Sequence, residues 1–403
     1  MRVLNVHNKH QGHGGSEVVF EFVTRLLREH GHEVQELSRD NAEIGGLGAK
    51  LAAAASMVWS RRSARQMSEI IDSFSPDVVH IHNLYPQLSP SIVHACRTRG
   101  VPVVVHVHDY KFTCPTAQHL RDGKVCEKCL TGKAYWCAIH NCRGSRAMSV
   151  AYAARNMSAA LMGTLKNDTT FFLPCSKFVG DLLVRGGFPQ NKIRVLHNCS
   201  ELPDVPARST HGNYVAYVGR ISPEKGIDNL LEVARRIPEV PVHIAGEVDK
   251  MQAVIDTAPG NVKFVGKLSR QGVADFLAEA RAVVVPSIWH EAFGLVAVEA
   301  MGRRLPVVAS KMGGLQEIVD DGVNGYLVDP HDLDTWASRI RDLWNNPQGA
   351  SRMGELGREK VIAQFSPVVY YQRLLSIYQQ AVAQVRNVAS SVDANSRQRM
   401  TQI

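Results

Sequence analysis

The chain has 403 residues, of which 45% are hydrophobic and 21% are charged, and its formal net charge is +8. This composition is typical of a globular protein, and the length predicts two or three domains. No stretch approaches 18 consecutive apolar residues, which excludes a transmembrane helix. The positive charge favours phosphates, anionic lipid head groups or nucleic acid as partners, although ordinary surface charge is the alternative.

The N-terminal sequence MRVLNVHNKH has only a short apolar run and no small-residue cleavage site, so it does not read as a signal peptide. We therefore expect a cytoplasmic protein. In that compartment its eight cysteines should be mostly reduced.

The first half of the chain alternates short β-rich runs with helical segments. The expected strands are 2–7, 33–38, 78–83, 101–108, 169–176 and 193–198, and the longest helical segments are 16–29 and 44–74. Short buried strands that alternate with helices predict a parallel sheet with helices on both faces.

A polar segment with two prolines, residues 201–213, predicts an interdomain linker. Beyond it the same alternation restarts, with expected strands at 214–219, 242–246, 262–266, 282–287, 306–310 and 325–329. The fold class is therefore α/β, with two Rossmann-like doubly wound domains at 1–200 and 207–365. Ligands are expected at the carboxyl ends of the strands and in the cleft between the domains.

After the second domain, residues 366–385 open with Ser366 and Pro367 and predict an amphipathic helix that packs back on the N-terminal domain. The polar tail 386–403 is expected to be disordered.

The stretch 46–67 combines an apolar helix with Arg61, Arg62 and Arg65. Basic residues beside an apolar face suit a peripheral contact with an anionic membrane, and a lipid-linked acceptor would fit there. An ordinary helix packed on the sheet explains the stretch equally well.

Five of the eight cysteines fall within 114–142, in an insert at 110–145, with the spacing C-x11-C-x2-C-x7-C-x4-C. A C-x2-C pair with flanking cysteines predicts a structural zinc ion, because tetrahedral thiolate sites use such spacing. The expected ligands are Cys114, Cys126, Cys129 and Cys142, with Cys137, His119 and His140 as substitutes. Reduced cysteines without metal are the alternative.

The loop after the first strand of the second domain reads GRISPEKG, residues 219–226. Arg220 and Lys225 flank a turn that leads into a helix, so two cations and free N–H groups could hold a diphosphate. Gly14 and Gly15, between the first strand and first helix of domain one, are a weaker counterpart. Neither loop matches a dinucleotide fingerprint or a P-loop.

The stretch HEAFGLVAVEAMG, residues 290–302, places Glu291 at a strand's carboxyl end and Glu299 within a largely apolar helix. A carboxylate in such a helix is costly unless it has donors to bind, and sugar hydroxyls are such donors. A buried cation or an N–H group is the alternative partner of Glu299.

The triplet Asp-x-Asp at Asp332 and Asp334 follows the last expected strand at a helix start. Helix capping explains it, so we do not assign it to a metal site.

Taken together, these motifs resemble those of retaining GT-B glycosyltransferases of family 4, the glycosyl transferases group 1. HEAFGLVAVEAMG resembles the family's E-x7-E motif, and GRISPEKG resembles its G-R-x-x-x-x-K-G loop. SKMGGLQEIVDDGVNGYLVDPHD (310–332) resembles the following segment. The cysteine-rich insert resembles inserts in some bacterial polysaccharide enzymes of this kind.

The resemblance implies a role for each matched residue. Arg220 and Lys225 would hold the donor diphosphate, Glu291 would bind the transferred sugar, and His108 in HVHD (106–109) would orient sugar or acceptor. The remaining donor contacts would come from Gly14, Gly15, Gly219, Lys267, Leu268, Phe293, Gly294, Leu295 and Glu299, with Glu299 on the ribose and Lys267 and Leu268 near the base.

The implied reaction moves a hexose-type sugar from a nucleoside-diphosphate sugar to a saccharide or polyprenyl-linked acceptor, in the synthesis of a cell-surface polysaccharide or glycolipid. Charge on the leaving diphosphate would be stabilised by the two cations and a helix N-terminus, so no catalytic metal is required.

Two alternatives stay open. One is a sugar-nucleotide epimerase on the same fold. The other, a zinc-containing nucleic-acid binder, is disfavoured because the basic residues are scattered and no recognition module is present.

Overall fold

The computed structural model describes residues 1–9, 15–41, 46–204, 212–248 and 251–400. The chain forms two compact units. Unit 1 comprises Met1–Ala117, Glu127–Leu196 and the segment from Tyr371 onward, and unit 2 comprises Gln118–Cys126 and His197–Tyr370. In the part of the chain described, no helix is long and apolar enough to cross a membrane.

Unit 1 is built on a parallel sheet of order β2-β1-β3-β4-β7. Its strands are β1 (Arg2–Lys9), β2 (Glu33–Asp40), β3 (Val78–Ile81), β4 (Val103–Val107) and β7 (Phe171–Pro174). β3, β4 and β7 are buried along their whole length, as expected for strands covered on both faces. The strand expected at 193–198 is wrong, because the segment makes a single bridge, between Phe172 and Ile193.

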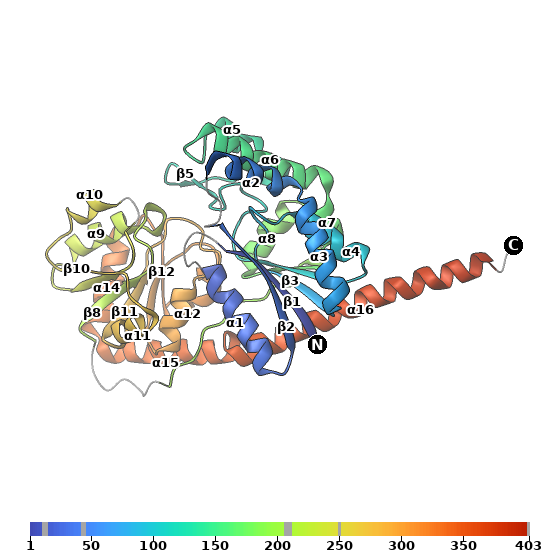
Figure 1. The fold of residues 1–403 in the computed structure, drawn as a ribbon. Helices are drawn as coiled ribbons and strands as arrows, with labels where there is room; N and C mark the ends of the chain where they lie inside the picture. The colour runs from blue at the N-terminus through green and yellow to red at the C-terminus, as the bar shows by residue number, and fades with distance from the viewer. Residues whose placement is uncertain (10–14, 42–45, 205–211, 249–250, 401–403) are drawn as a thin grey trace. The chain divides into compact units, whose positions relative to one another are not determined.

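Helices connect the strands of unit 1 (Figure 1). They are α1 (Gly15–Glu29), α2 (Gly46–Val58), α3 (Arg61–Phe74), α4 (Pro90–Thr98), α5 (Tyr135–Ile139), α6 (Arg146–Met162), α7 (Thr164–Asp168) and α8 (Lys177–Arg185), with short 3-10 turns η2 (Leu130–Gly132) and η3 (Gln190–Lys192). The segment expected as one helix at 44–74 is divided because Ser60 caps α3, its hydroxyl accepting from the Ser63 N–H.

Unit 2 carries a six-stranded parallel sheet of order β10-β9-β8-β11-β12-β13. Its strands are β8 (Tyr214–Val218), β9 (Val242–Ala245), β10 (Val262–Gly266), β11 (Ala280–Val285), β12 (Val307–Ser310) and β13 (Gly325–Val328), and all six expected strands are confirmed. The helical elements are η4 (Pro223–Lys225), α9 (Ile227–Arg236), α10 (Gln252–Ile255), α11 (Arg270–Ala278), α12 (Leu295–Gly302), α13 (Leu315–Ile318), α14 (Leu333–Asn345) and α15 (Pro347–Gln364). Trp336 of α14 is buried in this core with Val284 and Ile244.

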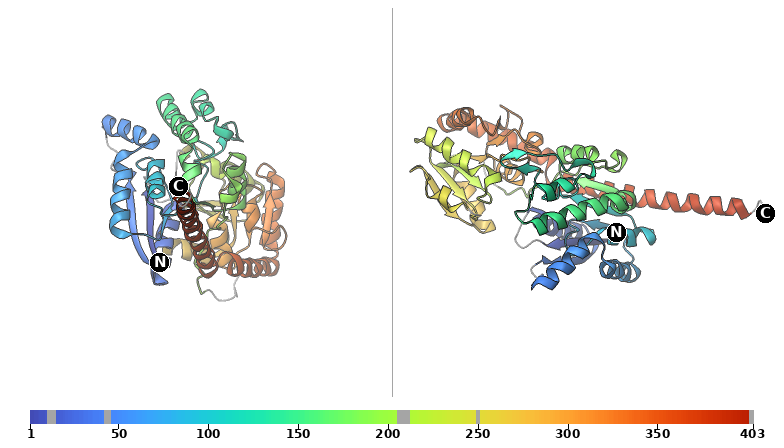
Figure 2. Two further views of the ribbon diagram at one scale, coloured as in Figure 1. Left: turned by 90° about the vertical axis from the view of Figure 1, so that its right-hand side faces the viewer. Right: turned by 90° about the horizontal axis from the view of Figure 1, so that it is seen from above.

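The last helix, α16 (Pro367–Met400), is one uninterrupted helix in Figure 2. Its part from Tyr371 onward belongs to unit 1, where the Tyr378 hydroxyl lies 2.7 Å from His80 Nδ1 of β3. The helix continues through 386–400, where we expected a disordered tail.

The segment Gln118–Cys126, which belongs to unit 2, forms a short antiparallel hairpin of β5 (Leu120–Arg121) and β6 (Lys124–Val125). Residues 205–211 of the expected linker lie outside the described residues.

Candidate active site

The site in unit 2 is assembled from three loops that follow parallel strands. The loop 219–226 follows β8, the loop 286–294 follows β11, and Gly313 and Gly314 follow β12. The first two are joined by the Ile288 N–H, which donates to the Glu224 carbonyl at 3.1 Å. The last two are joined by the Gly314 N–H, which donates to the Glu291 carbonyl at 2.8 Å.

Close backbone approach explains the glycines of these loops. Gly226 has a φ of +73°, and a Cβ there would meet the Pro286 carbonyl oxygen at 1.9 Å. Gly294, at the start of α12, has a φ of +110°, which L side chains rarely adopt. A side chain at position 226 would displace the loop after β11, and one at position 294 would meet the Leu315 side chain at 2.6 Å.

The Glu291 carboxylate is the centre of the site. Its Oε1 lies 2.7 Å from Lys225 Nζ and also accepts from the Ser287 hydroxyl and the Trp289 indole N–H. Burial raises the pKa of Glu291, but the charge of Lys225 and the hydrogen bonds from Lys225, Ser287 and Trp289 lower it by more, so the net shift is downward. Glu291 is therefore held as an anion.

The two cations of the site differ in exposure. Lys225 is mostly buried, and its Nζ lies over the Trp289 ring at 5.3 Å. Arg220 is 57% exposed, and its guanidinium is paired with the buried Glu224 at 2.9 Å. The structure thus leaves the Arg220 cation open to a ligand while Glu224 fixes its position.

Glu299 lies on α12, as expected, and its environment differs from that of Glu291. Among the described residues its carboxylate has no hydrogen-bond partner, and its charged neighbours are Arg303, Arg270 and Glu201. Burial raises the pKa of Glu299, an effect that Arg303 and Arg270 partly offset. The structure therefore does not show the alternative we considered, direct pairing with a buried cation.

The other expected donor contacts fall on the same loops. Phe293, Gly294 and Leu295 run from the β11 loop into α12, with Phe293 buried. Gly219 follows β8 and Lys267 follows β10, where its exposed Nζ pairs with Glu247 at 2.8 Å. Leu268 is next to it in the chain.

Unit 1 contains a second group of polar residues, at the carboxyl ends of β1, β3 and β4. His108 Nε2 lies 3.1 Å from His82 Nδ1, and burial lowers the pKa of His108 well below 6.5, with smaller contributions from neighbouring histidines and Lys111. Gly15 begins α1, whereas Gly14 lies outside the described residues.

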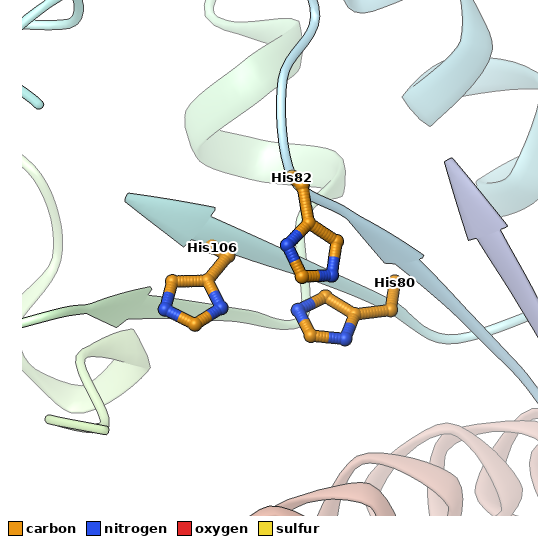
Figure 3. A group of neighbouring side chains, drawn as sticks. All are labelled: His80, His82 and His106. Atoms are coloured by element: carbon orange, nitrogen blue, oxygen red, sulfur yellow. The ribbon is translucent and has the colours of Figure 1, made fainter. Parts of the chain in front are cut away.

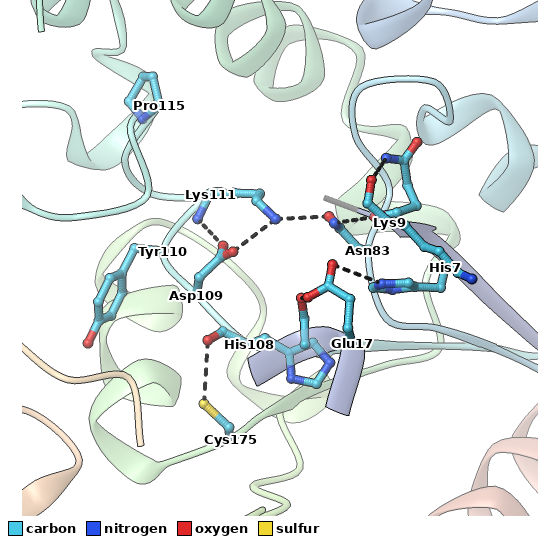
Figure 4. A network of polar contacts seen from close by, with 12 residues as sticks. His7, Lys9, Glu17, Asn83, His108, Asp109, Tyr110, Lys111, Pro115 and Cys175 are labelled. Carbon is cyan, nitrogen blue, oxygen red and sulfur yellow. Dashed lines mark hydrogen bonds and ion pairs between the residues drawn. The ribbon is translucent and has the colours of Figure 1, made fainter. Parts of the chain in front are cut away.

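Figure 4 shows the polar network around His108. Lys111 Nζ lies 2.9 Å from both Asp109 Oδ2 and Asn83 Oδ1, and His7 lies 3.4 Å from the buried Glu17. We did not single out these residues from the sequence. The alternation in HIHN (80–83) and HVHD (106–109) was the signal available.

All eight cysteines are free thiols. Cys137, expected only as a substitute, is hydrogen-bonded to Cys142 and lies near Cys114. Burial is the main cause that raises the pKa of Cys137 to about 12, and the two neighbouring thiols add to it. Cys129 lines a pocket of about 530 Å³ with Gly132 and Phe188. Cys126 ends the β5–β6 segment, where its N–H donates to the His119 carbonyl at 2.8 Å. The zinc site stays a prediction.

Asp332 caps α14, its carboxylate accepting from the Thr335 N–H at 3.1 Å, and Asp334 pairs with Arg236. Capping therefore accounts for Asp332, as we expected, and an ion pair accounts for Asp334.

In comparisons with known proteins, each half of the chain matches a glycosyltransferase family model. Residues 200–360 match the model for glycosyl transferases group 1, and residues 14–199 match the glycosyl transferase 4-like domain. The chain belongs to the group 1 glycosyltransferases.

Several curated proteins are similar in sequence to part of this chain. The D-inositol 3-phosphate glycosyltransferase of Mycolicibacterium smegmatis is 38% identical over 188 residues, which is 44% of this chain and 42% of the relative. The enzyme of the same name from Mycobacterium leprae is 37% identical over 183 residues, 42% of each chain. The match thus spans less than half the length of these relatives.

Solved structures with a similar fold superpose on nearly the whole of this chain. Anabaena HepE in complex with UDP superposes with a TM-score of 0.66 at 17% identity, covering 94% of this chain and all of HepE. Sucrose-phosphate synthase from Thermosynechococcus elongatus gives a TM-score of 0.68 at 19% identity, covering 95% of this chain and 99% of the synthase. These similarities confirm the GT-B fold.

Proposed function

We propose that this glycosyltransferase moves a hexose-type sugar from a nucleoside-diphosphate sugar to a saccharide or lipid-linked saccharide acceptor, with retention of configuration at the anomeric carbon. The observation that supports the donor best is the ion pair of Lys225 and Glu291, fixed by Ser287 and Trp289 and accompanied by the exposed Arg220. This arrangement offers positive charge for a diphosphate next to a carboxylate for sugar hydroxyls.

The proposed division of roles follows the electrostatics. Departure of a nucleoside diphosphate develops negative charge, which prepositioned cations stabilise without reorganisation. Lys225 and Arg220 supply that charge. Glu291, held as an anion, accepts hydrogen bonds from the sugar, and Glu299, whose carboxylate lacks a partner among the described residues, accepts them from the ribose.

The solved structures of related fold support a uridine nucleotide as the first donor base to test, because HepE has been seen with UDP and with UDP-glucose. In the proposed reaction unit 1 supplies His108, whose imidazole is neutral near pH 7; with Nε2 accepting from His82, its Nδ1–H can donate a hydrogen bond to a hydroxyl oxygen. No metal is needed for these steps.

The acceptor proposal is supported by the surface of unit 1. Arg61, Arg62 and Arg65 are exposed on α3, and α5 and α6 expose Ile139, Val150 and Leu161. Exposed basic and apolar side chains on this unit suit a peripheral contact with an anionic membrane, where a polyprenyl-linked acceptor would be presented. We further propose that Cys114, Cys126, Cys129 and Cys142, with Cys137 as a substitute, hold a structural zinc ion.

A donor panel tests the function. Each nucleotide sugar is scored by thermal shift and by slow release of free nucleoside diphosphate, with wild type and the Arg220→Ala/Lys225→Ala double variant. One donor should stabilise wild type and be hydrolysed, and the double variant should lose both effects. A new epimer without nucleotide release would instead support the epimerase, and binding of no nucleotide sugar would contradict the proposal.

A further inference from the structure

Four histidines lie at alternate positions along two neighbouring strands of unit 1. His80 and His82 belong to β3 and its end, and His106 and His108 to β4 and its end. Alternate residues of a strand point to one face of a sheet. Because His80 is in register with Val104, His82 lies beside His106, so the four side chains share one face.

We propose that His80, His82 and His106 form a buried binding site for a divalent transition-metal ion, with Zn²⁺ as the ion of best fit. One ring nitrogen from each histidine lies within 4.8 Å of the other two. Figure 3 shows the three rings grouped around a common space, with blue nitrogen atoms directed into it. Nitrogens around a tetrahedral zinc stand roughly 3.3 Å apart, so the three rings, whose centroids lie 4.1–5.5 Å apart, would turn to bind the ion.

Unpaired nitrogens are the first support for the site. The side chains are at most 3% exposed, yet His80 Nε2, His82 Nε2 and both ring nitrogens of His106 have no hydrogen-bond partner among the described residues. Buried polar atoms are usually satisfied, so several unpaired nitrogens in one place point to a ligand that supplies the missing interactions.

The partners of the opposite ring nitrogens are the second support. His80 Nδ1 lies 2.7 Å from the Tyr378 hydroxyl, and His82 Nδ1 lies 3.1 Å from His108 Nε2. With the proton on Nδ1, each ring donates to its outer partner and keeps a free lone pair on Nε2. Metal-binding histidines are held in this way by their outer partners.

The protonation state also fits. Burial lowers the pKa of His80 and of His82 well below 6.5, and lowers that of His106 to about 3. Neutral imidazole is the form that binds metal. A set of imidazoles selects zinc, copper or nickel, whereas magnesium and calcium require oxygen ligands.

A small pocket reaches this cluster. His82, His106 and His108 line it, together with Asp109 and Lys111. The pocket could admit the ion and a water molecule as fourth ligand. Bound metal would tie β3 to β4 and, through His82, hold the ring of His108 in place. This site uses no cysteine, and it does not depend on the proposed glycosyl transfer.

Cobalt titration tests the proposal in the full chain after treatment with a chelator. Co²⁺ on imidazoles gives visible d–d bands without the near-ultraviolet band of thiolate ligands, so the experiment separates this site from the cysteine insert. Wild type and a Cys137→Ser/Cys142→Ser variant should each show the imidazole bands for one bound ion. His106→Leu should lose them, whereas the matched control His94→Gln, at an exposed histidine of unit 1, should retain them.

Thermal unfolding gives a second readout, because the difference in melting temperature between His106→Leu and wild type should change sign when metal is added. Without metal, His106→Leu should melt at or above the temperature of wild type, because it removes two unpaired buried nitrogens. With Zn²⁺, only wild type and the control should gain thermal stability. If His106→Leu fails to fold, X-ray absorption of zinc-loaded wild type decides the question. Binding through sulfur alone, or absence of bound cobalt and zinc, would overturn the proposal.

Discussion

Lys225 Nζ lies 2.7 Å from Glu291 Oε1, although the two residues are 66 positions apart in the chain. The pair joins the loop after β8 to the loop after β11. Each partner therefore sets the position and charge state of the other. Substitution of either residue should change activity or stability by a measurable amount.

Replacing Lys225 by methionine should lower kcat/KM for the donor by about 100-fold or more, because removal of a prepositioned charge typically costs that much. The same change leaves Glu291 buried without its cation. Steady-state kinetics with the identified donor measures the effect. Lys263→Ala, an exposed lysine on β10, is the matched control and should retain activity. Equal activity of the Lys225 variant and the control would contradict the role of Lys225.

Glu299→Gln should raise the donor KM by about tenfold while kcat changes little, because the ribose is remote from the reacting carbon. Its effect on stability has a defined sign. The pKa of Glu299 is raised in the folded state, so ionisation costs stability above that pKa and the cost disappears as pH falls through it. The variant should therefore gain more in Tm over wild type at pH 7 than near pH 4.

Glu279→Gln, at an exposed position, is the control for both measurements. If the Tm difference between Glu299→Gln and wild type were the same at both pH values, burial of Glu299 would not affect its titration.

The contribution of Glu291 to stability depends on pH in the opposite direction to that of Glu299. Its pKa is lowered in the folded state, so its ionisation stabilises the fold above the unfolded-state value near 4.5, and this contribution is lost as pH falls through the lower folded-state pKa. Compared with Glu291→Gln, wild type should lose stability between about pH 5 and the acid limit of folding. Urea unfolding across that range checks the trend, and a constant difference would argue against the ion pair.

Gly226→Ala should destabilise unit 2 by about 2–4 kcal/mol, because the left-handed φ and a Cβ at 1.9 Å from the Pro286 carbonyl both oppose it. Gly260→Ala is the matched control, since a Cβ there meets no atom within 4 Å. Urea unfolding of both variants measures the difference. A Gly226→Ala protein as stable as the control would show that the two loops separate easily.

His108→Ala should lower kcat by about 10²–10⁴-fold with a small effect on donor Kd, as expected for a group that orients a reacting hydroxyl. Because burial holds its pKa well below 6.5, the rate should show no inflection from His108 between pH 6 and 8. His94→Ala, on an exposed histidine, is the control. An inflection near 6.5 that disappears in His108→Ala would contradict the assignment of a neutral imidazole.

The sequence by itself determined the two parallel sheets, because hydrophobic runs of strand length and intervening helices are local signals. It also placed Arg220, Lys225, Glu291 and Glu299 at strand ends and on a helix start, since these follow directly from the expected elements. It failed at 193–198, where strand composition produces a single bridge, and at 386–400, where polar residues still form a helix.

Only the tertiary structure decided which side chains are partners. The contrast between Glu291 and Glu299 depends on Lys225, Ser287 and Trp289, which approach one carboxylate and not the other. The histidine cluster likewise depends on the register of β3 and β4 and on Tyr378, almost 300 residues away in the chain. Strand periodicity determines which face of the sheet a residue occupies. Register and long-range packing determine its neighbours, and the neighbours determine its pKa and whether it can bind a ligand.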